Sequence, residues 1–178
     1  MALIETTAPD KAEGKLAELY AQTEQMFGAV PNNVRMLGVS PAILENQLDF
    51  AAYYMEHPKL KMHFWAMLRM VVSAQCDSPY CEALNAGLLA QMGLEPGQVD
   101  EAKANPEKAP LDDNEKALLL FVLKAVKDPH SVTASDVDEL RAKGWTDRDM
   151  FDAVAHGSRV VGTNILFDTF KIDADKLG

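Results

Sequence analysis

The chain has 178 residues, of which 48% are hydrophobic, and its formal net charge is −10 with an isoelectric point near 4.8. This length allows one domain with a sizeable core, and the hydrophobic content excludes a disordered chain. An acidic balance without a basic stripe argues against nucleic acid or an anionic membrane as the main partner. No apolar run reaches the roughly 18 residues that a membrane span requires, and the first residues do not form a signal peptide.

Cysteine usage predicts a reduced, cytoplasmic protein. Two cysteines in 178 residues do not make a disulfide scaffold. The two cysteines and the four scattered histidines show neither zinc nor iron–sulfur spacing. We therefore expect no metal and no cofactor.

Apolar periodicity, together with start and stop residues, predicts about nine helices. In chain order they are expected over 9–27, 31–37, 41–56, 59–74, 79–92, 95–105, 115–127, 133–143 and 148–171. No segment alternates apolar and polar residues in the way that an exposed strand does. The fold class is therefore predicted as an all-α bundle, with residues 1–178 forming one domain.

The most apolar segment is 59–74, which is apolar on nearly every side. A helix of this kind is buried, so we place it at the centre of the domain. In so small a domain, such a helix also agrees with surface that is buried between subunits. An oligomer is therefore expected.

Both cysteines lie in one short turn after this segment. Ser78 followed by Pro79 is a helix-start signal, in which a hydroxyl caps free N–H groups and proline occupies the first helical position. Cys81 then falls at about the third helical position, where the positive end of the helix dipole favours an anion and makes the thiol a candidate for a lowered pKa. Asn85 follows one turn later on the same face.

The order of these features resembles the alkylhydroperoxidase AhpD-like / carboxymuconolactone decarboxylase family, in its peroxidase-related subgroup. The resemblance depends on Pro79-Tyr80-Cys81 opening a helix after a long apolar one, and on the Gly93-Leu94 stop. It is strongest over the core motif region 60–99 and looser over 112–173. It implies the AhpD-like helical bundle, assembled as a homo-trimer or hexamer.

The peroxidase members of that family carry Cys-x-x-Cys-x-x-x-His and an upstream glutamate. The second cysteine of the motif falls on Cys81, but the first falls on Ser78 and the histidine falls on Asn85. The glutamate would fall near Ala66, with no acid beside it. The motif is thus degenerate, and the other cysteine of the chain, Cys76, gives a Cys-x4-Cys spacing instead.

A thiol peroxidase needs a thiolate, a group that takes its proton and a resolving thiol. Cys81 is the candidate attacking thiolate, and Cys76 is the candidate resolving thiol if the two Cα atoms lie within about 7 Å. His156 is the best replacement base by residue type. The alternatives are that both thiols are inert packed side chains and that His156 is a hydrogen-bonded helix histidine.

These residues are compatible with two functions. The first is an antioxidant thiol-dependent peroxidase that reduces a hydroperoxide and is regenerated by a thiol electron donor. The second is a non-redox or decarboxylase-like member of the fold that binds a small apolar molecule or organic acid beside the turn, with Ser78, Tyr80 and Asn85 contacting it. A structural or interaction protein without a pocket at the turn is the third alternative.

Overall fold

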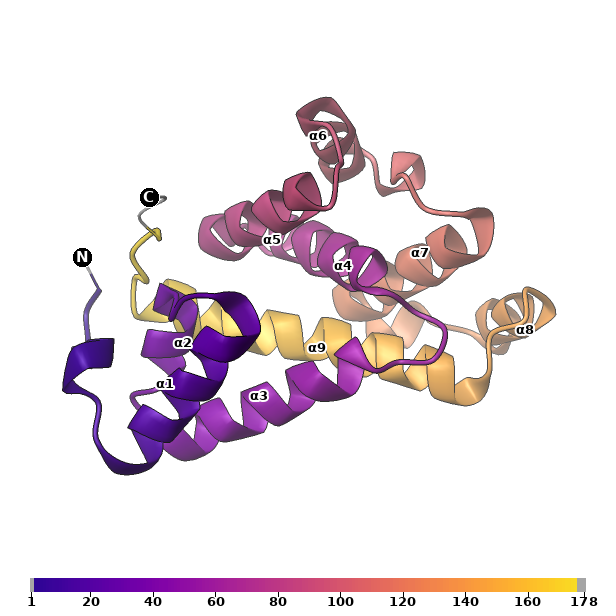
Figure 1. Cartoon of the computed structure of the whole chain (residues 1–178). Helices are drawn as coiled ribbons and strands as arrows, with labels where there is room; N and C mark the ends of the chain where they lie inside the picture. Colours follow the sequence, from indigo (N-terminus) through magenta and orange to yellow (C-terminus); the bar gives the residue numbers. More distant parts are fainter. Residues whose placement is uncertain (1, 176–178) are drawn as a thin grey trace. The chain divides into compact units, whose positions relative to one another are not determined.

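The computed structural model describes residues 2–175, and this part of the chain is helical with no strand. It contains nine α-helices, which confirms the predicted all-α class and the expected number of helices (Figure 1). Their bounds are α1 Gly14–Phe27, α2 Asn32–Leu37, α3 Pro41–Met55, α4 Met62–Gln75, α5 Pro79–Gln91, α6 Pro96–Ala104, α7 Asp113–Lys127, α8 Ala134–Ala142 and α9 Asp147–Thr169. Three short 3₁₀ turns, Pro9–Lys11, Pro106–Lys108 and Pro129–Ser131, accompany them.

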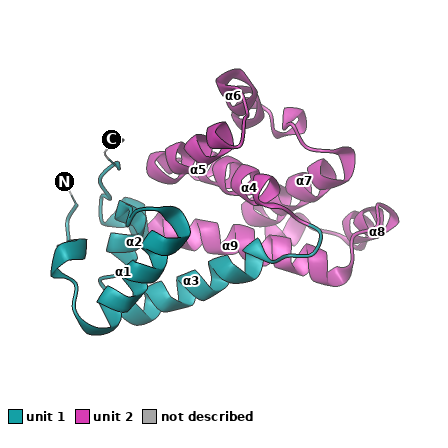
Figure 2. Cartoon of the chain, viewed as in Figure 1, with its two compact units in different colours: residues 1–59, 166–178 teal, residues 60–165 magenta. Residues whose placement is uncertain are grey.

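The chain divides into two compact units, coloured separately in Figure 2: Met1–Lys59 with Leu166–Gly178, and Leu60–Ile165. In the first unit the two ends of the chain are joined, because Leu3 N donates to Phe170 O at 2.8 Å and Ala2 N donates to Asp173 Oδ2 at 3.2 Å. The predicted single domain over 1–178 remains a prediction.

The first predicted helix differs from the observed one. Instead of one helix over 9–27, the chain forms the 3₁₀ turn Pro9–Lys11 and then α1 from Gly14. Ala12 and Glu13 are extended, and Gly14 has a φ of +55°. Two extended residues followed by a left-handed glycine cannot continue a right-handed helix, so the two helical segments are separate.

The second unit is built around α4, as its apolar sequence predicts. Most of its side chains from Phe64 to Val72 are buried, and α4 packs against α5, α6 and α7. The buried residues are Phe64, Trp65, Ala66, Met67, Leu68, Met70, Val71 and Val72. The C-terminal helix α9 also reaches α4, where Asn164 Nδ2 donates to Ser73 Oγ at 3.3 Å and both residues are buried.

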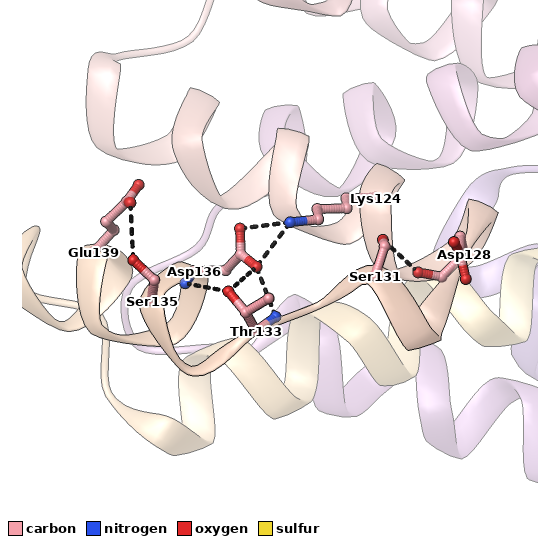
Figure 3. A network of polar contacts seen from close by, with 7 residues as sticks. All are labelled: Lys124, Asp128, Ser131, Thr133, Ser135, Asp136 and Glu139. Carbon is pink, nitrogen blue, oxygen red and sulfur yellow. Dashed lines mark hydrogen bonds and ion pairs between the residues drawn. The ribbon is translucent and has the colours of Figure 1, made fainter.

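A polar network joins α7 to the start of α8 on the outside of this unit (Figure 3). Lys124 Nζ lies 2.7 Å from both carboxylate oxygens of Asp136. Thr133 caps α8 through a capping box with Asp136, whose Oδ2 also accepts from Thr133 N and Oγ1. The carboxylate of Asp136 therefore serves both as the ion-pair partner of Lys124 and as part of the cap of α8.

Within residues 2–175, no helix combines the length and the hydropathy that a membrane crossing demands.

Candidate active site at the turn between α4 and α5

The turn that carries the cysteines is tightly defined by backbone hydrogen bonds. Cys76 follows the last residue of α4, and Asp77 adopts a left-handed conformation with a φ of +53°. Ser78 N then donates back to Ser73 O at 2.9 Å. This pattern ends α4 in the manner of a Schellman motif. It reverses the chain, so that α5 packs along α4.

The two thiols lie on either side of this turn. Cys81 is the third residue of α5, as predicted, and it is buried. Cys76 is partly buried, and no disulfide joins the two. A thiol in the first turn of a helix experiences the positive end of the helix dipole, which favours its anionic form.

Ser78 does not cap α5 as the sequence predicts. Its side chain makes no cap hydrogen bond, and its Oγ is buried without a hydrogen-bond partner among the described residues. The backbone N–H of Ser78 instead donates to Ser73 O at the end of α4.

Asn85 links the two helices of this hairpin. Its Nδ2 donates to Cys81 O at 2.7 Å, and its Oδ1 accepts from Arg69 Nε on α4 at 2.7 Å. The sequence motifs do not single out Arg69. A signal for it is nevertheless present, since it is the only Lys, Arg, Asp or Glu in Met62–Gln75.

The site contains a cation in a desolvated setting. Burial lowers the pKa of Arg69 to about 10, and an ionised Cys81 acts in the opposite direction. The guanidinium therefore remains charged at neutral pH. Because electrostatic attraction is reciprocal, the same interaction favours the thiolate form of Cys81.

His156 reaches this region from α9 and is buried. Its ring lies against Trp65 of α4, with ring centroids 4.8 Å apart and planes inclined by 39°. Burial lowers the pKa of His156 well below its usual value, and the positive charges of Arg69 and Arg159 lower it further. The imidazole is therefore neutral at pH 7, the form that accepts a proton.

A groove of about 520 Å³ lies next to the cysteine turn. One of its lining residues, Gln75, directly precedes Cys76, and another, Lys103, forms an ion pair with Glu82, which directly follows Cys81. The full lining is Val71, Ala74, Gln75, Asp100, Lys103, Ala104 and Pro106. Tyr80, the second residue of α5, is partly exposed and does not line this groove.

The structure thus brings together Cys81, Asn85 and Arg69 from α5 and α4, while His156 of α9 packs against Trp65 of α4 and experiences the charge of Arg69. Within residues 2–175, no three His, Cys, Asp or Glu side chains are grouped as metal ligands. The catalytic roles of Cys81, Cys76 and His156 and the substrate-binding roles of Ser78, Tyr80 and Asn85 all remain predictions.

Comparison with solved structures identifies the fold class of the chain. No family model matches the sequence, and no curated protein matches it. Among solved structures, an AhpD-core, uncharacterized peroxidase-related protein from Ralstonia eutropha JMP134 is similar over 98% of this chain and 93% of its own, with a TM-score of 0.86 and 22% identity. The chain therefore has the AhpD-like fold, as the resemblance predicts.

Two further structures are similar over nearly the whole chain. An uncharacterized peroxidase-related protein from Silicibacter sp. TM1040 has a TM-score of 0.81 at 20% identity, with 97% of this chain and 91% of that one covered. The debrominase Bmp8, in complex with 2,3,4-tribromopyrrole, has a TM-score of 0.76 at 16% identity, with 98% and 92% covered.

Proposed function

We propose that the protein is a thiol-dependent oxidoreductase that reduces a small hydroperoxide, with Cys81 as attacking thiolate and Cys76 as resolving thiol. The observation that carries this proposal is the placement of the two cysteines. One thiol lies in the first turn of α5, and the other lies at the residue that ends α4, with only a tight turn between them. The first position favours a thiolate, and the second would close a small disulfide loop when the two Cα atoms lie within about 7 Å.

In the first step the Cys81 sulfur attacks the terminal peroxide oxygen. A sulfur–oxygen bond forms, the oxygen–oxygen bond breaks, and the thiolate is oxidised by two electrons to a sulfenic acid. The peroxide is reduced to an alkoxide, which takes one proton to leave as an alcohol. The neutral imidazole of His156 is proposed to pass that proton from the Cys81 thiol to the alkoxide, and its lowered pKa favours giving the proton up rather than keeping it.

In the second step the Cys76 thiol attacks the sulfenic acid. The sulfur–sulfur bond forms, and the hydroxyl leaves as water. An external dithiol, or two equivalents of a monothiol, then reduces the disulfide and regenerates both cysteines. The electron donor is therefore a small thiol or a protein thiol.

The test combines peroxide turnover with mass spectrometry of the cysteines. Cys81→Ser should abolish peroxide consumption with dithiothreitol as reductant. Cys76→Ser should still consume one equivalent of peroxide and accumulate a sulfenic acid on Cys81. A wild-type protein that never forms the Cys76–Cys81 disulfide, together with a Cys81→Ser variant of unchanged turnover, would contradict the proposal.

A second candidate function is binding of a small molecule without redox chemistry. It is favoured by Ser78 Oγ, a buried hydroxyl without a hydrogen-bond partner among the described residues, beside the helix that carries Asn85. The structural similarity to a debrominase bound to a halogenated pyrrole suggests one probe. The Cys81→Ser variant should be thermally stabilised by 2,3,4-tribromopyrrole or by a small organic acid, and Ser78→Ala should weaken that effect. Equal melting temperatures with and without these probes would exclude this function for them.

We further propose that the protein assembles as a homo-trimer or a hexamer in the cytoplasm. The support is the resemblance of the sequence to a family with such assemblies. Sedimentation velocity of the purified protein tests the assembly, and a monomer at assay concentration would contradict it.

A further inference from the structure

The family resemblance implies a relay with a histidine and a glutamate, and this chain has neither residue at the corresponding positions. The position expected to hold a histidine is Asn85, which cannot take a proton, and the position expected to hold a glutamate is near Ala66. Arg69 lies one helical turn after Ala66 on the same face of α4. It is therefore a cation that occupies the region where the relay would have an acid.

Asn85 holds the guanidinium in a defined orientation. The amide nitrogen of Asn85 donates to Cys81 O, which directs its oxygen toward Arg69 Nε. Exchanging the two amide atoms would set an NH₂ group against the guanidinium donors, so the hydrogen bonds determine the orientation. With both distances at 2.7 Å, the path from Arg69 through Asn85 to the first turn of α5 is continuous.

Among the described residues, no carboxylate forms an ion pair with Arg69, and its polar partner is the neutral amide of Asn85. A partly buried cation gains most from a nearby anion, because burial reduces screening by water. The ionisable group that opposes the effect of burial on the pKa of Arg69 is Cys81.

We propose that Arg69, held in place by Asn85, is a positioning residue that keeps Cys81 in the thiolate form by its opposite charge. This inference rests on the proposed function only in taking Cys81 as the reactive thiol. Asn85 then acts as the anchor of a cation, and not as a degenerate remnant of a proton relay. The thiolate is formed by electrostatic attraction, and a base is needed only to receive the proton.

The experiment measures the ultraviolet absorbance of the thiolate as a function of pH in a Cys76→Ser background, where Cys81 is the only cysteine. Between about pH 4 and 10, Arg69→Met should shift the titration midpoint upward by about one unit or more, a roughly tenfold smaller thiolate fraction below the midpoint. Arg69→Lys should retain much of the parent midpoint because it keeps the charge. Asn85→Ala should give an intermediate upward shift, since the charge remains but its anchor is lost.

Arg148→Met is the matched control, because Arg148 is an exposed arginine on α9 with an ion pair to Asp152. The titration midpoint of Cys81 in Arg148→Met should equal that of the Cys76→Ser parent. An unchanged midpoint in Arg69→Met would overturn the inference. If that variant loses its helical circular dichroism, Asn85→Ala decides, and an unchanged midpoint there would overturn it equally.

The inference and the proposed function fail in different ways. Midpoints that shift as expected, in a protein without peroxide turnover, would uphold the role of Arg69 and refute the peroxidase. Peroxide turnover through Cys81, with a Cys81 titration midpoint that does not change in Arg69→Met, would support the peroxidase and refute the role of Arg69.

Discussion

Two cations in the second unit of the chain are held in opposite ways. Lys124 is paired with the carboxylate of Asp136 within a network that also caps α8 (Figure 3). Arg69 is paired with the neutral amide of Asn85, next to a buried thiol. The first arrangement cancels charge and organises the start of a helix, whereas the second keeps a positive charge in a desolvated place. A cation without a carboxylate partner remains able to act on a neighbouring sulfur, and this separates a site for chemistry from a structural contact.

The largest expected effect is a loss of stability, caused by a substitution that disturbs the packing beside the candidate site. A Cβ at Gly157, next to His156 on α9, would lie 2.6 Å from Val122 Cγ1 and 3.3 Å from Val126 Cγ2 on α7. Gly157→Ala should therefore destabilise the protein by about 1–3 kcal/mol, as overpacking does, measured by urea denaturation. Gly162→Ala on the same helix is the control, since a Cβ there meets no atom within 4 Å. It should be neutral or stabilise by up to roughly 1 kcal/mol.

The next prediction removes each of the two cations, Arg69 and Lys124, in a separate variant. Arg69→Met should slow alkylation of Cys81 by iodoacetamide about tenfold near neutral pH, and it should leave amide hydrogen exchange in α8 unchanged. Lys124→Met should leave the alkylation rate unchanged and speed exchange at the start of α8. If Lys124→Met slowed alkylation as strongly as Arg69→Met, the distinction between the two regions would be lost.

A smaller effect concerns the pH dependence of the α7–α8 network. The hydrogen bond from Lys124, followed by those from Thr133, lowers the pKa of Asp136 to about 2. A carboxyl group with a depressed folded-state pKa stabilises the protein above its unfolded value of about 4, and this contribution is lost as the pH falls through about 2. Asp136→Asn should therefore lower the melting temperature near pH 6, and the difference from wild type should shrink on acidification between these two values.

Ser135→Ala serves as the control for this titration. In Figure 3, Ser135 is drawn in the same network, but its side chain makes, within residues 2–175, only an exposed 3.5 Å contact with Glu139. The melting temperature of Ser135→Ala should equal that of wild type at every pH. A difference between Asp136→Asn and wild type that stays constant down to pH 2 would contradict the assigned pKa.

The smallest expected effect concerns the cysteine turn itself. Asp77 has a φ of +53°, a conformation that glycine adopts without strain and that aspartate tolerates better than most residues. Asp77→Gly should raise the stability by a few tenths of a kcal/mol. Lys171→Gly, at a φ of +54° in the first unit, should give a larger gain of about 1 kcal/mol, because lysine has no such tolerance. A loss of stability in Asp77→Gly would indicate that its side chain, and not its backbone, supports the turn.

Most helix boundaries follow from local chemistry. The start of α5 at Pro79, the capping aspartate before α7 and the buried run of α4 are all predictable from periodicity and cap residues. The break before α1 is not, because Ala12 and Glu13 are compatible with a helix and only their extended backbone separates the segments. The failure of Ser78 to cap α5 is also not predictable, since serine followed by proline is the local pattern that favours a cap.

The amino-acid sequence by itself determined an all-α chain whose two thiols flank one turn, because helix starts, stops and apolar periodicity are properties of neighbouring residues. Only the tertiary structure decided what surrounds those thiols. Arg69 binds Asn85 because α4 packs against α5, and His156 contacts Trp65 because α9 packs against α4. Burial and the positions of charges then determine whether a thiol is reactive, and neither quantity is encoded in a local pattern of residues.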